Sequence, residues 1–250
     1  MIEIAVVLQA RLSSTRMPGK VLQNFANTQS ILDMQLRSLR ALELPLKLAT
    51  TTNPNDDALA EFARNEDLPF YRGPEQDVLG RFIAASDAAY LIRICSDNPF
   101  LDIASITSFL EEIEEGVDYI SYQSTEGTPA IRTHWGLFAE VVSRKALIQA
   151  HQSTENHLKG AFFREHVTNY IYGHQEQFNV TLLDAPEIIK DRNDLRFTID
   201  TPEDFENMQK LYKIILRNGG DFSLENLVRT ADEHEEIKAV MGEGIAKFSK

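Results

Sequence analysis

The chain has 250 residues, of which 43% are hydrophobic and 25% are charged, and its formal net charge is -13. This length can bury a substantial core and lies near the size at which one domain becomes two. The composition predicts a soluble globular protein. No apolar stretch approaches the roughly 20 residues that span a bilayer, so we expect no membrane insertion. The negative charge disfavours a nucleic-acid polymer as partner.

The N-terminal segment is predicted to form a strand at residues 2–8 and lacks the basic and apolar regions of a signal peptide. The single cysteine, Cys95, excludes an internal disulfide and a multi-cysteine metal site. Because Cys95 lies in the apolar run 91–95, we expect a buried structural thiol rather than a nucleophile. These features predict a cytoplasmic protein.

The segment 9–20 follows the first strand and contains three cations, three hydroxyls and a glycine. Backbone amides and positive charge at such a turn bind phosphate. Since the remainder of the chain is acidic, this cationic loop suggests a small polyanionic ligand. It is not a Walker P-loop, because Ser14 and Val21 stand where that motif needs a glycine and a hydroxyl. A basic surface turn after a buried strand is the alternative interpretation.

Short apolar runs alternate with helical patterns through the rest of the first half. The further strands are expected at residues 46–50, 70–72 and 91–94. This alternation predicts parallel strands joined by right-handed crossovers. Ligands of such sheets bind beyond the carboxyl ends of the strands, where the cationic loop and Asp97 would emerge.

The second half predicts further strands and helices in a mixed sheet. Strands are expected at 118–121, 137–142, 178–183 and 195–199, and helices near 164–172, at 202–217 after a Thr201 cap, and at 225–240. Residues 123–135 are predicted to form a long mobile loop. We expect one α/β domain over residues 1–220, with a mixed and mostly parallel sheet, and a peripheral helical tail over 221–250.

Two aspartates each follow an apolar strand candidate. Asp97 follows the run 91–95, and Asp200 follows the run 197–199. Mg²⁺ prefers a few carboxylates together with phosphate oxygens and water. The pair therefore predicts a magnesium site beside the cationic loop, whereas an Asx turn or helix cap is the alternative for either residue alone.

The cationic loop resembles the Q-A-R-x-x-S-T-R-x-P-G-K motif of sugar-nucleotide cytidylyltransferases, in particular the spore-coat polysaccharide cytidylyltransferase-like family, which is related to CMP-Kdo and CMP-sialate synthetases. Four further segments match in order, at residues 72–79, 93–99, 164–168 and 195–204. The resemblance implies a nucleotide-diphospho-sugar transferase (GT-A-like) fold. It also implies a Mg²⁺-dependent reaction in which the hydroxyl of a sugar acid attacks the α-phosphorus of CTP, releasing pyrophosphate.

The resemblance also implies roles for individual residues. The catalytic set would be Lys20, Arg11, Asp97 and Asp200, with Asp97 and Asp200 holding the metal. The nucleotide would be bound by Gln9, Ala10, Arg11, Ser14, Thr15, Arg16, Lys20, Arg72, Gly73, Asp77 and Val78. The acceptor would be bound by Glu140, Arg164, Glu165 and His166. His166 would orient or deprotonate the attacking hydroxyl, and a polar cluster at a helix start is the alternative.

The chain departs from the family pattern at Phe138, where relatives commonly carry a carboxylate, so the identity of the acceptor does not carry over. Two other functions therefore stay open. A glycosyltransferase that consumes a nucleotide-sugar is disfavoured because the usual Asp-x-Asp motif is absent at 97–99. A non-catalytic nucleotide-binding module is kept open by Phe138. The expected partners are CTP, an acidic sugar acceptor and, from the resemblance alone, a second copy in a homodimer.

Overall fold

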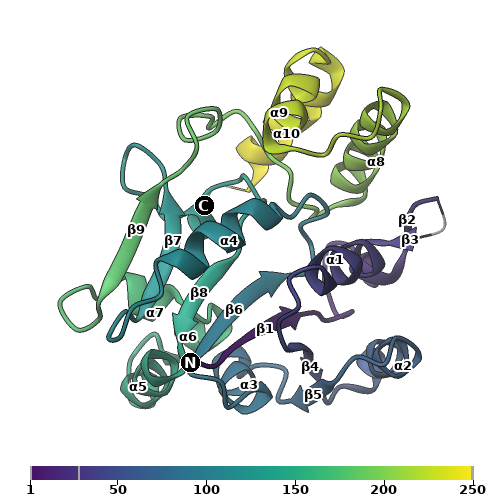
Figure 1. The fold of residues 1–250 in the computed structure, drawn as a ribbon. Coiled ribbons are helices and arrows are strands. Elements are labelled where there is room, and N and C mark those ends of the chain that lie inside the picture. The colour runs from purple at the N-terminus through teal and green to yellow at the C-terminus, as the bar shows by residue number, and fades with distance from the viewer. Residues whose placement is uncertain (1, 28, 249–250) are drawn as a thin grey trace.

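The computed structural model describes residues 2–27 and 29–248. A seven-stranded sheet in the order β5-β4-β1-β6-β8-β7-β9 forms its centre (Figure 1). The strands are β1 (Ile4–Gln9), β4 (Leu46–Thr51), β5 (Phe70–Gly73), β6 (Tyr90–Cys95), β7 (Tyr119–Gln123), β8 (Glu140–Ser143) and β9 (Val180–Asp184). Only β8 runs antiparallel to its neighbours β6 and β7, and the other pairs are parallel. The expected mixed, mostly parallel sheet is confirmed.

Helices cover both faces of this sheet. One face carries α1 (Ile31–Arg40), α2 (Asp57–Asn65), α4 (Ile103–Glu111) and α8 (Pro202–Arg217), and the other carries α3 (Val78–Ala85), α5 (Arg144–Thr154), α6 (Gly160–Glu165) and α7 (Asn169–Tyr172). Successive side chains of a strand point to opposite faces. Accordingly, Val6 and Leu8 are buried in the first core, and Ala5 and Val7 are buried in the second.

Short elements and loops complete the chain. They are the hairpin β2 (Asn24–Ala26) and β3 (Gln29–Ser30), the 3₁₀ turns η1 (Lys20–Leu22), η2 (Pro54–Asp56) and η3 (Ala130–Arg132), and the helices α9 (Leu224–Asp232) and α10 (Glu235–Lys247). No helix within residues 2–27 and 29–248 is both long and apolar enough to cross a membrane.

Helix α8 begins where the sequence predicted. The Thr201 side chain accepts a hydrogen bond from the Asp204 N–H at 3.2 Å, and the Asp204 carboxylate accepts one from the Thr201 N–H at 3.0 Å. This capping box satisfies two N–H groups at the helix start. Pro202 occupies the first turn, where no N–H is needed.

Three predicted elements differ in the structure. Residues 195–199 have no regular secondary structure and form no strand of the sheet. The N–H groups of Phe197 and Ile199 donate to the carbonyl oxygens of Trp135 and Asp97. The predicted helix at 164–172 is divided into α6 and α7 by residues 166–168. The predicted helix at 225–240 is likewise two helices, α9 and α10, with a break at residues 233–234.

The C-terminal helices are integrated into the fold rather than peripheral. Figure 1 shows α9 and α10 grouped with α8 at one end of the molecule. Their side chains Leu227, Val228, Ile237 and Met241 are buried in the same core as β1 and β6. Hydrophobic burial of this kind stabilises by about 25 cal/mol per Å², so this segment contributes to the main core.

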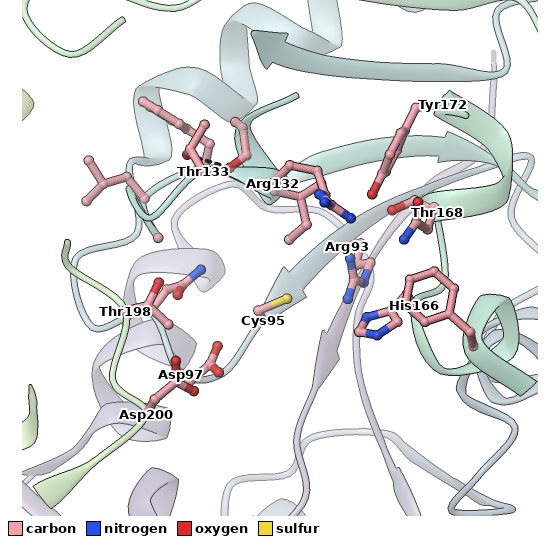
Figure 2. A pocket seen from close by; sticks show the side chains of 18 of the residues that line it. Arg93, Cys95, Asp97, Arg132, Thr133, His166, Thr168, Tyr172, Thr198 and Asp200 are labelled. Carbon is pink, nitrogen blue, oxygen red and sulfur yellow. Dashed lines mark hydrogen bonds between the residues drawn. The ribbon is translucent and has the colours of Figure 1, made fainter. Parts of the chain in front are cut away.

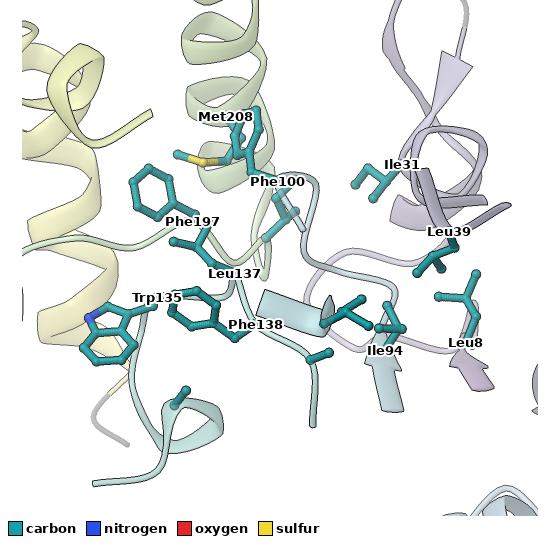
Figure 3. Close-up of a cluster of buried hydrophobic side chains, with 14 of the residues drawn as sticks. Leu8, Ile31, Leu39, Ile94, Phe100, Trp135, Leu137, Phe138, Phe197 and Met208 are labelled. Carbon is teal, nitrogen blue, oxygen red and sulfur yellow. The ribbon is translucent and has the colours of Figure 1, made fainter. Parts of the chain in front are cut away.

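The predicted loop at 123–135 ends in a buried anchor. Trp135 is 1% exposed, and its indole Nε1 donates to the Arg192 carbonyl oxygen at 3.1 Å. Figure 3 shows Trp135, Leu137 and Phe138 in the cluster that also holds Phe197. The C-terminal end of the loop is therefore packed against the core, which the polar composition of the loop did not indicate.

Candidate active site

A cavity of about 460 Å³ lies beyond the carboxyl end of β6. Figure 2 shows side chains from several segments that are distant in sequence converging on it. The polar lining includes Arg16, Arg93, Cys95, Asp97, Arg132, His166, Thr168, Tyr172, Thr198 and Asp200. Four of the predicted site residues, Arg16, Asp97, His166 and Asp200, are therefore brought to one cavity.

The alternation of β6 explains one wall of this cavity. Ile92 and Ile94 are fully buried in the core, whereas Arg93 and Cys95 of β6, and Asp97 in the turn that follows it, line the cavity. A period of two places every second side chain on the same face of a strand. Cys95 is consequently half-buried in the cavity wall. The expectation that it is buried is wrong, whereas its structural role stays a prediction.

Lys20 joins the two aspartates. It is 7% exposed, and its Nζ lies 3.3 Å from Asp97 Oδ2 and 3.8 Å from Asp200 Oδ1. The same Nζ donates to the carbonyl oxygen of Ile199. Gly19, with a φ of 72°, adopts the left-handed conformation directly before η1 and so turns the chain toward these acids. One ammonium therefore contacts both carboxylates, which places the two acids beside each other.

Asp200 is surrounded by cations. Arg16 Nη2 donates to its Oδ1 at 2.6 Å, and Arg196 Nη2 donates to its Oδ2 at 2.7 Å. Burial alone would raise the pKa of Asp200, but the hydrogen bond from Arg196 and the charges of Lys20 and Arg16 outweigh it, so the pKa is lowered. Asp200 is thus held as a carboxylate at neutral pH.

A close approach of two loops positions this acid. Gly136 has a φ of 62°, and a Cβ atom there would lie 2.1 Å from Thr198 Oγ1. Only a glycine allows the backbone to pass so near. Thr198 and Asp200 both face the cavity as a result.

Glu140 lies behind the cavity wall and not in its lining. It is 2% exposed and accepts hydrogen bonds from Tyr119 Oη at 2.5 Å, from Thr168 Oγ1 at 2.7 Å and from Arg93 Nη1. Because β8 is antiparallel to β6, its first residue pairs with Arg93 near the ligand edge. Glu140 therefore positions Arg93 and Thr168, which do line the cavity.

His166 lies in the break between α6 and α7 and faces the cavity. Burial lowers the pKa of its imidazole; the carboxylate of Glu165 opposes this shift, and the nearby arginines Arg93 and Arg132 add to it. The net pKa lies below the ordinary value of 6.5. The ring is therefore neutral at pH 7 and able to accept a proton.

The other residues of the cationic loop lie at the exit of β1. Gln9 Oε1 accepts hydrogen bonds from the Arg93 guanidinium at 3.3 Å, and Ala10 is buried. Arg11 faces Glu165 at 3.6 Å, with both side chains partly exposed. Ser14 Oγ accepts from the Met17 N–H at 3.4 Å. Thr15 is exposed.

Other predicted residues have structural partners and lie outside the cavity lining. Arg72 donates to the carbonyl oxygens of Thr51 and Asn53 at 2.7 and 2.9 Å, and Gly73 ends β5. Asp77 caps α3 and contacts His151 Nε2 at 3.0 Å. Val78 is a buried core residue, and Arg164 and Asp77 line a separate surface cavity. The ligand roles of these residues stay predictions.

Sequence reasoning assigned no role to several polar residues of the site, namely Arg93, Arg132, Thr168, Tyr172, Arg196 and Thr198. The sequence did contain an indication for Arg93, because an arginine within an apolar strand must pair with a polar or charged group when it is buried. Arg196 and Thr198 share the period-two spacing that leads to Asp200. Arg132 and Tyr172 carried no such signal, since only the tertiary arrangement brings them to the cavity.

Two carboxylates are the donor set that the site offers to a metal. Within the part of the chain that the structure describes, no group of three or more His, Cys, Asp or Glu residues could hold an ion. Such a pair suits Mg²⁺, which takes one or two carboxylates and completes its shell with phosphate oxygens and water. The residues present therefore fit a metal that arrives with a nucleotide.

Comparison with known proteins identifies the family. Residues 5–235 match the family model described as cytidylyltransferase. The spore coat polysaccharide biosynthesis protein SpsF of Bacillus subtilis is 32% identical over 223 residues, covering 84% of this chain and 87% of that protein.

Two solved structures share the fold. A cytidylyltransferase from Leptospira borgpetersenii has a TM-score of 0.79 and 22% identity, covering 95% of this chain and 97% of that chain. CMP:2-keto-3-deoxy-manno-octonic acid synthetase, complexed with CTP, has a TM-score of 0.58 and 13% identity, covering 85% of this chain and 99% of that chain. The fold is thus the nucleotide-diphospho-sugar transferase fold, as expected. The family model and the SpsF relative together show that this chain belongs to the cytidylyltransferase family.

Proposed function

We propose that this protein transfers CMP from CTP to the hydroxyl of an acidic sugar for surface-polysaccharide biosynthesis, releasing pyrophosphate in a Mg²⁺-dependent reaction. The observation that carries the proposal is the convergence of Asp97 and Asp200 on Lys20, beside Arg16. The names of its relatives support CTP as the donor and polysaccharide biosynthesis as the context. A homodimer and a cytoplasmic location stay predictions from the sequence.

Some site residues would neutralise charge, and another would transfer a proton. Asp97 and Asp200 would hold Mg²⁺, which neutralises charge on the phosphates when bound. Lys20 supplies a point charge and Arg16 a planar fork, the two forms of cation that bind phosphate oxygens. His166, neutral at pH 7, accepts the proton of the attacking hydroxyl. The attacking oxygen bonds to the α-phosphorus, and the bond to pyrophosphate breaks.

The test measures pyrophosphate release from CTP, ATP, GTP and UTP with Mg²⁺ and a panel of sugar acids that includes 2-keto-3-deoxy-manno-octonic acid and N-acetylneuraminic acid. We expect pyrophosphate release with CTP and at least one acid. The amount of pyrophosphate should equal the amount of CMP-sugar formed. Tight CTP binding without release over the whole panel would instead favour a non-catalytic nucleotide-binding module. Calorimetric binding of UDP-sugars in preference to CTP would favour a glycosyltransferase.

A further inference from the structure

The cavity has two chemically different ends (Figure 2). Asp97 and Asp200 lie at one end, and Arg93, Arg132 and His166 lie at the other, with Cys95 between them. The first end accounts for the metal and the phosphates. The second end carries the guanidinium groups of Arg93 and Arg132, and the proposed reaction with CTP has so far given Arg132 no ligand.

Ion pairing singles out one arginine of the lining. Arg16 pairs with Asp200 at 2.6 Å, and Arg93 pairs with the buried carboxylate of Glu140. Arg132 is exposed and forms no ion pair with a residue in 2–27 or 29–248; its guanidinium interacts with Tyr172 instead. When an arginine lines a cavity and has no carboxylate partner, its guanidinium N–H groups are available to bind an anion.

The surroundings of Arg132 favour a small carboxylate. Burial and the charge of Glu140 raise the pKa of Tyr172 to about 12, so its hydroxyl remains protonated and neutral. Thr168 and Asn169 add uncharged polar groups, and Ile131 and Phe138 add apolar wall. His166 lines the same end, so an anion on Arg132 lies on the side of the cavity where the attacking hydroxyl is deprotonated.

We propose that Arg132 binds the carboxylate of the acceptor and so selects acidic over neutral sugars. This inference rests on the proposed function, because it names the group that orients the acceptor of that reaction. Planar guanidinium and carboxylate form two parallel hydrogen bonds, which fix the orientation of the sugar as well as its charge. Phe138 in the cavity lining adds no competing negative charge at this end.

Steady-state kinetics provide the first test, with the acceptor acid and its methyl ester as matched substrates. Loss of a hydrogen-bonded charge pair corresponds to roughly a 10- to 100-fold effect, so R132Q should raise the KM for the acid by about that factor while the KM for CTP stays unchanged. R132K should restore part of the preference for the acid. Equal KM values for the acid in wild type and R132Q would overturn the proposal.

Alkylation of Cys95 tests the same site without turnover. Cys95 is the single cysteine of the chain and lines the cavity, so the ratio of its rates with iodoacetate and iodoacetamide measures the attraction of a carboxylate. We expect R132Q to lower this ratio several-fold. R132K should keep it, and so should R37Q, which removes an exposed arginine of α1 outside the cavity. An unchanged ratio in R132Q, or an equal fall in R132K, would contradict an anion site at this residue.

The two readouts separate the proposals. A ratio that depends on Arg132, in a protein that releases no pyrophosphate with any acid, would retain the carboxylate site and reject the transferase. Turnover of an acid by wild type and R132Q with the same KM would retain the transferase and reject the role of Arg132.

Discussion

The backbone N–H of Ile199 donates a hydrogen bond to the carbonyl oxygen of Asp97 at 3.0 Å. This bond links an irregular segment outside the sheet to the loop that follows β6. Each segment carries one acid of the site, and Lys20 contacts both. The pair of acids that we propose to bind the metal thus depends on a contact between segments that are far apart in the sequence.

Lys20→Met should abolish most of the activity. The substitution keeps the length of the side chain but removes the charge that faces Asp97 and Asp200 and that we propose faces the phosphates. Removal of one electrostatic donor from an active site lowers kcat by roughly 100- to 1,000-fold, and pyrophosphate release measures this. Lys210→Met, at an exposed position of α8, should retain wild-type kcat. Near-normal turnover in Lys20→Met would exclude the assigned role.

Glu140→Gln should destabilise the fold. The carboxylate is 2% exposed and holds the buried Arg93, so its neutralisation leaves a buried positive charge without compensation. Breaking such a pair costs about 3–5 kcal/mol, which urea denaturation would detect. In the matched control, Glu165→Gln removes an exposed pair at 3.6 Å and should cost less than about 1 kcal/mol. Equal losses in the two variants would contradict this account.

His166→Gln should lower kcat by about 100-fold or more if the imidazole is the general base. Because burial lowers its pKa below 6.5, the wild-type kcat/KM for the acceptor should decrease only as the pH falls below that value. The variant should lack this acid limb, whereas His157→Gln, outside the cavity lining, should keep it. A variant that retains both kcat and the acid limb would favour the alternative of a structural polar cluster.

The stability of the fold should depend on pH through Asp200. Its folded pKa is lowered from 3.8, so the ionised group contributes stability above 3.8, and this contribution is lost as the pH falls through the folded pKa. Wild type should therefore lose more stability between pH 5 and about pH 2 than Asp200→Asn does, in urea denaturation at each pH. Asp191→Asn, at an exposed position, should follow the wild-type curve.

The sheet and its ligand edge could be predicted because they depend on local patterns. The apolar runs of β1, β4, β5 and β6 and the spacing of Arg93, Cys95 and Asp97 are read directly from the chain. The helix breaks at residues 166–168 and 233–234 could not be predicted, because the helical periodicity of the sequence continues across them. The position of Asp200 was anticipated by analogy with a strand end, although the segment before it is held by loop contacts. The place of Arg132 depends on the tertiary packing of residues 123–135 alone.

Binding of Mn²⁺ in the presence of CTP, followed by electron paramagnetic resonance, tests the central claim most directly. Mn²⁺ takes the same oxygen ligands as Mg²⁺, and the measurement requires no acceptor. We predict that wild type binds Mn²⁺–CTP. The affinity for this complex should fall at least about tenfold, or about 1.4 kcal/mol, in Asp97→Asn and in Asp200→Asn. A double variant that binds Mn²⁺–CTP as tightly as wild type would contradict the claim that these two acids hold the metal.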